Sequence, residues 1–502
     1  MDSTIFDKII LGFSVAVTPS NLMFCFIGVF FGTLVGVLPG LGPVAAISLL
    51  FPITFKMPAV SAIILLAGIF YGAQYGGSTT SILLKIPGEA SSIVTCLDGY
   101  QMARQGRAGP ALGIAAFGSF IAGTLGVVGL MFLAPVLGKA ALSIGAPEYF
   151  ALTFLGLTLV TSLTSGSTVK ALIMATLGLL AGCTGADPIS GYQRFTFGSF
   201  TLVDGLGIVP VAMGMFGIGE VLENIASTID TGGIYEAKIK RLLPTLRDWK
   251  DSVGAIIRGS VVGFLVGILP GPSVTLSSLT SYAIEKKVSR HPEKFGTGVI
   301  EGVAGPESAN NAATSGAFIP LVSLGIPANI SMALFMGALM IHGIQPGPLF
   351  IGNHPDIFWG FIISMYVGNV LLLLLNLPLI GIWVRFLKIP YVILIPFILL
   401  FCMIGAYTLN NNVGDAIIML IFGVFGYLIR KVGLEAAPFI LALVLGPIME
   451  RCLRQSLMIS HGDPAIFLTH PISAVLLGLG VLSILFSVFS PAIRRRLKEE
   501  AG

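Results

Sequence analysis

Long apolar stretches dominate the chain, and short breaks rich in glycine, proline and small polar residues separate them. Four of the longest apolar stretches are residues 109–137, 357–384, 390–409 and 471–490. A helix needs about 20 apolar residues to cross a bilayer, so the whole pattern predicts roughly 10–14 membrane segments. Before the first long stretch, apolar residues from Ile5 to Phe13 recur at helical spacing, which predicts an interfacial helix over residues 1–19.

One apolar segment with a glycine-rich face occurs twice, at residues 32–40 and 263–271. Glycines recur every fourth residue from Gly28 in the first copy and from Gly259 in the second. This spacing keeps them close to one helix face, where another backbone can approach tightly. A Pro-Gly pair ends each copy, because proline lacks an N–H group and glycine tolerates positive φ. The pattern predicts paired, broken helices such as those around which transporters build binding sites; two tightly packed helices without a ligand are the alternative.

Runs of small polar residues follow each copy at membrane depth. They occupy residues 74–81 in the first half and 301–315 in the second, and helix breaks at 85–89 and 325–329 come after them. Lipid-exposed irregular backbone is not tolerated there, so both runs should face protein or a water-filled cavity. A surface loop is the alternative for the first run. The repeat therefore extends over most of each half with an offset of roughly 230–240 residues, beyond the solenoid periods.

The repeat divides the chain into five predicted regions. They are the interfacial helix (1–19), a first membrane repeat (20–228), a polar linker (229–251), a second membrane repeat with C-terminal scaffold helices (252–490) and a basic cytoplasmic tail (491–502). The predicted fold is an all-α polytopic membrane protein. Its two repeats are expected to have inverted topology and to contain broken helices or re-entrant hairpins.

Charge supports the inversion, because Lys and Arg mark cytoplasmic loops. The first broken helix is flanked sparsely, by Lys8 and Lys56, whereas the second is flanked densely by residues 238–250 and 286–294. The later breaks have the opposite bias: arginines follow the first, while residues 295–384 contain no Lys or Arg. Matched loops that differ in charge predict that the two repeats lie in opposite orientations.

Composition excludes a soluble globular protein. Of 502 residues, 55% are hydrophobic and only 10% are charged, against roughly 25% charged in soluble domains. The five scattered cysteines form no CxxC pair and indicate neither a disulfide framework nor a metal site. The motifs H-E-x-x-H, G-x-S-x-G and G-x-x-x-x-G-K-[ST] are absent, which argues against an enzyme and against direct ATP drive.

Several motifs together resemble TctA, the large membrane subunit of the tripartite tricarboxylate transporters. They are residues 75–84, 86–90, 97–100, 103–113, 194–198, 307–313 and 341–348. The resemblance covers nearly the whole chain. It implies a multi-pass secondary transporter of the bacterial inner membrane that imports carboxylates such as citrate, driven by Na⁺ or H⁺ and without a cofactor. It also implies two partners, a small membrane subunit (TctB-like) and a periplasmic substrate-binding protein (TctC-like). A channel for ions or solutes is the alternative, although two separate polar clusters do not make a continuous pore.

A carboxylate needs donors in a dry cavity, and helix N-termini supply unpaired N–H groups with partial positive charge. Small neutral side chains near the breaks add donors and acceptors without burying a fixed charge. The predicted substrate-binding residues are Gly40, Gly42, Ser78, Thr79, Thr80, Lys85, Pro87, Gly271, Asn310, Asn311, Thr314, Ser315, Pro327 and Asn329. The predicted ion-binding residues are Gly36, Pro39, Gly267, Pro270, Asn310 and Asn311.

Three charged or titratable residues, one of them already named above, have two interpretations each. Lys85 pairs with a substrate carboxylate or snorkels towards the membrane surface. Glu307 carries a proton or caps a helix, and His342 acts as a relay or lies in a loop.

Overall fold

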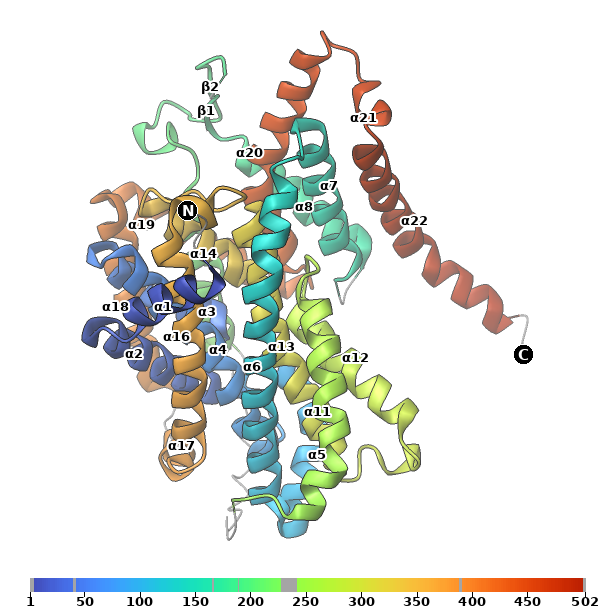
Figure 1. The fold of residues 1–502 in the computed structure, drawn as a ribbon. Helices are drawn as coiled ribbons and strands as arrows, with labels where there is room; N and C mark the ends of the chain where they lie inside the picture. Colours follow the sequence, from blue (N-terminus) through green and yellow to red (C-terminus); the bar gives the residue numbers. More distant parts are fainter. Residues whose placement is uncertain are drawn as a thin grey trace.

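The computed structural model describes residues 4–38, 42–164, 167–187, 189–226, 242–387 and 391–499, and most of them are helical (Figure 1). The first half contains α1 (Ile5–Ala16), α2 (Pro19–Val37), α3 (Pro43–Leu50), η1 (Phe51–Lys56), α4 (Ala59–Leu84), η2 (Ala90–Ile93), α5 (Thr95–Met102), η3 (Ala103–Arg107), α6 (Ala108–Ala141), α7 (Ala146–Ser162), α8 (Thr168–Gly182), β1 (Gly185–Ala186), β2 (Gln193–Arg194), η4 (Phe200–Leu202), α9 (Ile208–Ala212), η5 (Met213–Ile218) and α10 (Gly219–Ala226).

Residues 229–241 of the predicted linker lie outside the described part of the chain. The second half begins at α11. It contains α11 (Leu246–Gly267), α12 (Ser273–Val288), η6 (Pro292–Lys294), α13 (Glu301–Leu324), α14 (Ile330–Ile341), α15 (Phe350–Asn353), α16 (Pro355–Asn376), α17 (Ile380–Phe386), α18 (Tyr391–Asn410), α19 (Val413–Lys431), α20 (Ala436–Ile459), α21 (Ile466–Thr469) and α22 (Pro471–Glu499).

Nine helical segments within the described residues are long and apolar enough to cross a membrane. Three further apolar segments, Pro43–Lys56, Thr168–Gly182 and Ile330–Ile341, are shorter. The all-α polytopic class is thus confirmed. The number of long segments falls below the expected range of roughly 10–14 because the structure divides part of the apolar sequence into these shorter helices.

The glycine faces lie where two helices cross closely. Helix α2 packs on α4, and a Cβ atom added at Gly32 would lie 2.5 Å from the carbonyl oxygen of Ile69. Helix α11 packs on α13, and a Cβ atom added at Gly263 would lie 2.1 Å from the carbonyl oxygen of Ala309. Since no side chain fits at either place, the four-residue spacing of glycine is explained by direct backbone contact.

The order of elements around these crossings is the same in both halves. A short or medium helix (α3 or α12) follows the glycine-faced helix, and then comes a long buried helix (α4 or α13). Each long helix ends on a left-handed residue, Lys85 with φ 60° and Gly325 with φ 70°. The next long helix then packs across the other half: α6 against α13, and α16 against α4.

Helices α4 and α13 form the centre of the molecule. Every residue from Ser61 to Leu83 in α4 and from Gly302 to Ser323 in α13 is buried. Helix α6 runs beside them through the middle of the view in Figure 1. At the periphery, α1 packs on α16, and α22 leans away from the core with α7 as its main neighbour (Figure 1).

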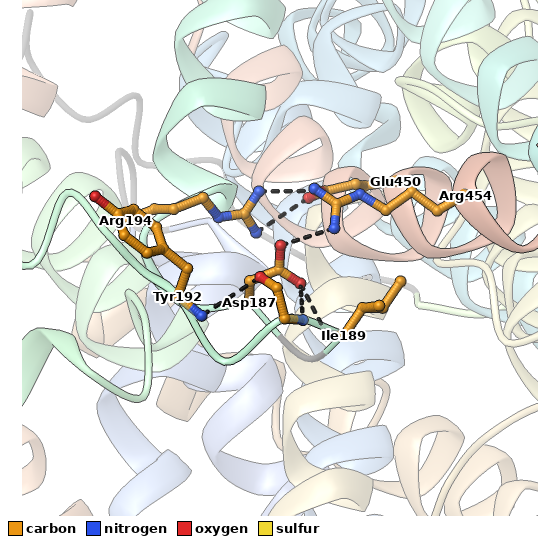
Figure 2. A network of polar contacts seen from close by, with 7 residues as sticks. Asp187, Ile189, Tyr192, Arg194, Glu450 and Arg454 are labelled. Carbon is orange, nitrogen blue, oxygen red and sulfur yellow. Dashed lines mark hydrogen bonds and ion pairs between the residues drawn. The ribbon is translucent and has the colours of Figure 1, made fainter.

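One loop, residues 183–207, leaves the helical body and is attached to α20 by charged side chains (Figure 2). Asp187 accepts hydrogen bonds from the N–H of Ile189 (2.8 Å) and from Arg454 (2.7 Å). Arg194 pairs with Glu450 at 2.8 Å. The Ile189 N–H and the Arg454 guanidinium hold the pKa of Asp187 well below its usual range. We call this network the loop clamp.

Candidate functional site

A cavity of about 460 Å³ lies between the two halves. Its wall contains the N-terminal ends of three helices: α3 from Gly42, α12 from Gly271 and α14 from Asn329. Phe70 and Gln74 of α4 contribute to the same wall, as do residues 87–90 after α4. The cavity therefore collects helix ends that follow the breaks in both halves.

The three helix ends differ in how their N–H groups are satisfied. Neither α3 nor α12 has a side-chain cap. Asn329 caps α14, because its side-chain oxygen accepts a hydrogen bond from the N–H of Met332 at 3.1 Å. The N–H of Gly271 donates to Ala328 at 2.8 Å and ties the start of α12 to the segment before α14. The N-termini of α3 and α12, which no side chain caps, place partial positive charge at the cavity, and such charge favours an anion.

Ser273 is the first residue of α12 and lies in the cavity wall. Its side chain is buried, with 1% exposed, and its hydroxyl oxygen has no hydrogen-bond partner. A buried polar group without a partner costs about 1–3 kcal/mol. A bound group that satisfies this hydroxyl would recover that cost, so the position suits a polar ligand.

The charged groups of the wall are Glu89, Glu220 and Arg430. Glu89 is buried and accepts a hydrogen bond from the N–H of Ser91 at 3.0 Å. Arg430 is partly exposed and pairs with Glu223 at 2.6 Å. Among the described residues of this wall, Arg430 is the one basic side chain, so it is the group able to form an ion pair with an anion.

Four of the predicted substrate-binding residues lie in the cavity wall: Gly42, Pro87, Gly271 and Asn329. Two other predicted residues at the first break, Pro39 and Gly40, lie outside the described residues. The structure thus brings together residues of the two breaks that are far apart in sequence. This arrangement is the one expected if both halves contribute to one site.

Most of the other predicted residues form a second cluster, buried between α4, α5, α6 and α13. Ser78 and Asn310 donate hydrogen bonds to the Glu307 carboxylate, at 2.5 and 3.3 Å. Asn311 donates to the hydroxyl of Ser119 at 2.8 Å. The remaining contacts are internal to the helix packing: Thr80 donates to the carbonyl of Val37 and Thr314 to that of Asn311, each at 2.6 Å. We call these residues the Glu307 cluster.

The last predicted residues lie apart from the cavity. Thr79 and Ser315 are buried within α4 and α13, and Pro327 is buried after the break. Lys85 is exposed, and its ammonium nitrogen lies 5.9 Å from the centroid of the Tyr100 ring. The roles predicted for these residues remain predictions.

The predicted ion-binding residues lie around the helix crossings. Gly36 and Gly267 have no room for a Cβ atom, which would lie 2.2 Å from the carbonyl oxygen of Ala73 and 2.5 Å from that of Ala313. Pro270 directly precedes the cavity residue Gly271. Their predicted ion-binding role also remains a prediction.

Sequence reasoning did not predict a binding role for several residues of the wall. Glu89 and Ser273 lie beside motifs used in the prediction, and Ser273 stands directly after Gly-Pro, where a helix N-terminus is expected. Glu220 and Arg430 come from helices distant in sequence, and no local pattern marks them. Only the folded chain places them at the same cavity.

Comparison with known proteins identifies the family. The model described as the tripartite tricarboxylate transporter TctA family matches residues 22–441. An Agrobacterium vitis protein, described as an uncharacterized 52.8 kDa protein in the TAR-I ttuC' 3'region, is 50% identical over 489 residues, which cover 97% of this chain and 96% of that protein.

A second Agrobacterium vitis protein, described as uncharacterized and located in the TAR-II ttuC' 3'region, is 51% identical over 234 residues. The match covers 47% of this chain and 96% of that protein. No solved structure matches the chain. The family match spans most of the multi-pass helical body and includes every residue that lines the cavity. The chain therefore belongs to the TctA family of tripartite tricarboxylate transporters and is a transporter subunit, not an enzyme.

Proposed function

We propose that this chain carries small carboxylates into the cell across the bacterial inner membrane, and that the cavity between the halves holds the substrate. The observation that supports this most directly is the convergence of three helix N-termini on one cavity, with the unpartnered hydroxyl of Ser273 in its wall. The uncapped N-termini of α3 and α12, the Ser273 hydroxyl and the Arg430 guanidinium are donors that match carboxylate oxygens.

Alternating access through inverted repeats is the mechanism we propose. The matched order of elements and the matched crossings of α2 on α4 and α11 on α13 support it. The charges support it as well. Arg107 pairs with Asp248, and Gln105 bonds to Thr297, so the basic residues near 104–107, 247–250 and 286–294 gather at one end of the molecule. By the positive-inside rule this end is cytoplasmic.

In this mechanism an elevator-like or rocking movement exposes the cavity to each side in turn, and an ion gradient, of Na⁺ or H⁺, drives accumulation. Asn310 and Asn311, which the sequence predicts to bind the ion, lie within the Glu307 cluster and remain the proposed ion site. This cluster includes Ser78 of α4, the helix that contributes Gln74 to the cavity wall. We propose that a TctB-like small membrane subunit and a TctC-like periplasmic binding protein complete the transporter, as the family name tripartite implies.

Uptake by the reconstituted complex tests this proposal. Liposomes containing this chain and the small subunit, supplied with the binding protein, are offered a panel of labelled di- and tricarboxylates. Sodium and proton gradients are imposed separately. We expect saturable accumulation that requires one gradient and the binding protein.

Two results would contradict the proposal. Flux that does not saturate and continues without a gradient would favour a channel. Full-rate uptake by this chain alone would remove the binding protein from the mechanism.

A further inference from the structure

Glu307 is a carboxylate buried at the contact between the two halves. It lies on α13 with 0% of its side chain exposed. Ser78 of α4 donates to one carboxylate oxygen at 2.5 Å, and Thr95 of α5 donates to the other. Asn310, one turn further along α13, donates to the same oxygen as Ser78. Three donors therefore surround this one carboxylate, two of them from the first half of the chain.

The same surroundings also suit the protonated acid, because Ser78 has a second acceptor. Its hydroxyl lies 3.3 Å from the carbonyl oxygen of Gln74 as well as 2.5 Å from Glu307. When Glu307 is protonated, its O–H donates to the Ser78 oxygen, and the Ser78 hydroxyl turns to Gln74. Thr95 and Asn310 continue to donate to the carboxyl group. Glu307 can therefore gain or lose a proton without leaving a buried group unsatisfied.

No basic group neutralises this carboxylate: among the described residues, no Lys, Arg or His nitrogen lies within 4 Å of it. The titratable side chains that face it are Tyr75 of α4, Glu89 before η2 and Cys96 of α5. Nearer the start of α13, beside Gly305, Arg258 of α11 and Glu285 of α12 pair with each other at 2.5 Å. Asp98 of α5 accepts hydrogen bonds from Tyr282 and from N–H groups of the loop at 296–299.

A permanent unpaired charge at this depth is costly, whereas a group that binds a proton when required is not. The site is also close to the cavity along one helix. Gln74 lies in the cavity wall, and Ser78 follows it by one turn of α4. Glu89, in the same wall, is linked to Gln74 through Ser91, which donates to the Gln74 side chain at 2.8 Å.

We propose that Glu307 binds the coupling proton of this transporter, with Ser78 as the hydroxyl that switches between donor and acceptor. The inference rests on the proposed function and names H⁺ as the coupling ion. The proton comes from water on the outer side, reaches the Glu307 carboxylate to form the neutral acid, and is released to water on the inner side. No other bond forms or breaks.

The sign of the coupling follows from charge. An anionic substrate in the cavity and an anionic Glu307 repel each other at low dielectric. Protonation removes this repulsion, so substrate binds more tightly when Glu307 is neutral, and by reciprocity bound substrate favours protonation. Substrate and proton therefore bind together and move together.

Two measurements test the proposal on the full complex. Infrared difference spectra follow the C=O band of a buried carboxylic acid as pH is lowered, without any need for transport. We expect a band that is absent in Glu307→Gln. Binding of citrate, or of the carboxylate with the greatest uptake in the panel, is then measured against pH. We expect an affinity that rises roughly 5- to 150-fold on acidification in the wild type and is flattened in Glu307→Gln.

The control is Glu301→Gln, on the first turn of the same helix and partly exposed, which should leave both readouts unchanged. If Glu307→Gln does not fold, Thr95→Val is the second variant. It removes a donor that stabilises the anion more than the acid, so the band should appear at higher pH.

An infrared band that persists unchanged in Glu307→Gln overturns the proposal, whatever the transport assay shows. Accumulation driven by Na⁺ at uniform pH and lost in Glu307→Gln overturns it in favour of a sodium site. Absence of all carboxylate binding, with the band still assigned to Glu307, would instead contradict the proposed function.

Discussion

Ser273 shows at the scale of a single residue how the cavity differs from ordinary helix packing. Many buried hydroxyls of the described helices donate to a carbonyl of the preceding turn, as Ser277 does to Val274 at 2.6 Å. Ser273 is the first residue of its helix, so no turn precedes it, and its hydroxyl has no partner. It differs from the other unpartnered hydroxyls, such as those of Ser281 and Ser308, in that it lies in the cavity wall. Its hydroxyl is therefore free for a ligand.

We predict that Ser273→Ala lowers the affinity for the transported carboxylate roughly fivefold to tenfold, which corresponds to the loss of about one hydrogen bond. The unfolding temperature should not fall, because the hydroxyl has no partner in the protein to lose. Isothermal titration of the purified chain measures the affinity. Ser277→Ala, four residues along the same helix, is the control and should bind normally. An unchanged affinity in Ser273→Ala would exclude this hydroxyl as a ligand.

At the scale of single residues, the sequence predicts which residue types occur near a helix break. It does not predict which neighbouring group each side chain contacts. Asn310 and Asn329 both follow the expected pattern of amides near a break. Asn329 caps α14 in the cavity wall, whereas Asn310 turns to Glu307 inside the helix packing. The difference depends on which neighbouring helix each residue meets, and that is a property of tertiary packing.

At the scale of helices, the glycine-faced crossings decide how closely the long helices approach. Position 263 tolerates no Cβ atom, because the contact there is with backbone of α13, which cannot rotate away. Gly478 on α22 has open space where its Cβ atom would lie. The two glycines therefore provide a matched comparison of a packed and an unpacked helix position.

We predict that Gly263→Ala destabilises the protein by about 1–3 kcal/mol, because the helices must separate to admit the methyl group. Gly478→Ala should cause no loss, since alanine favours a helix more than glycine does. Thermal unfolding in detergent compares the two. Equal unfolding temperatures for both variants would show that the α11–α13 crossing adjusts without cost.

The loop clamp predicts a pH dependence. The pKa of Asp187 is lowered in the folded protein, so its contribution to stability is present above its ordinary pKa of 3.8 and is lost as pH falls below that value. The difference in unfolding temperature between the wild type and Asp187→Asn should be constant from about pH 5 to 8 and shrink below about pH 4. The exposed Asp204 supplies the control, Asp204→Asn. A difference that grows on acidification would contradict the prediction.

Helix ends were predictable where a local rule applies. Pro270-Gly271 ends α11, whose last residue is Gly267, and Asn329 precedes α14 as a capping residue. Helix lengths were less predictable. Residues 43–56 look like one apolar segment, but the chain divides them into α3 and η1 at Phe51-Pro52. The proline at position 52 fits the first turn of a new helix and not the interior of a continuing one.

At the scale of the whole molecule, the arrangement of the two repeats relative to the membrane is open to direct test. We predict that Lys56→Cys and Lys287→Cys, each in a cysteine-free background, react with an impermeant thiol reagent from opposite sides of the membrane. Both side chains are exposed, so access does not limit the reaction. Labelling of both from one side would contradict inverted topology.

The membrane class followed from the composition of the sequence. The pairing of the two helix breaks followed from the motif that occurs once in each half. The shape of the cavity did not. Its wall includes Arg430 of α19 and Leu441 of α20, from the region predicted to be only scaffold. Residues separated by more than half of the chain reach this wall through packing between helices, which no local periodicity records.

The burial of α13 from Gly302 to Ser323 also has a consequence for biosynthesis. This helix contains Glu307, two asparagines and two prolines, and it is not among the segments apolar enough to cross a membrane by composition. By contrast, the C-terminal segment Pro471–Phe489 is strongly apolar and only 11% of it is buried. An isolated polar helix is poorly retained in lipid, because its polar groups lack partners there. We therefore expect α13 to remain at the translocon until α6 and α11 are in place, so that the core of the second half assembles around helices already inserted.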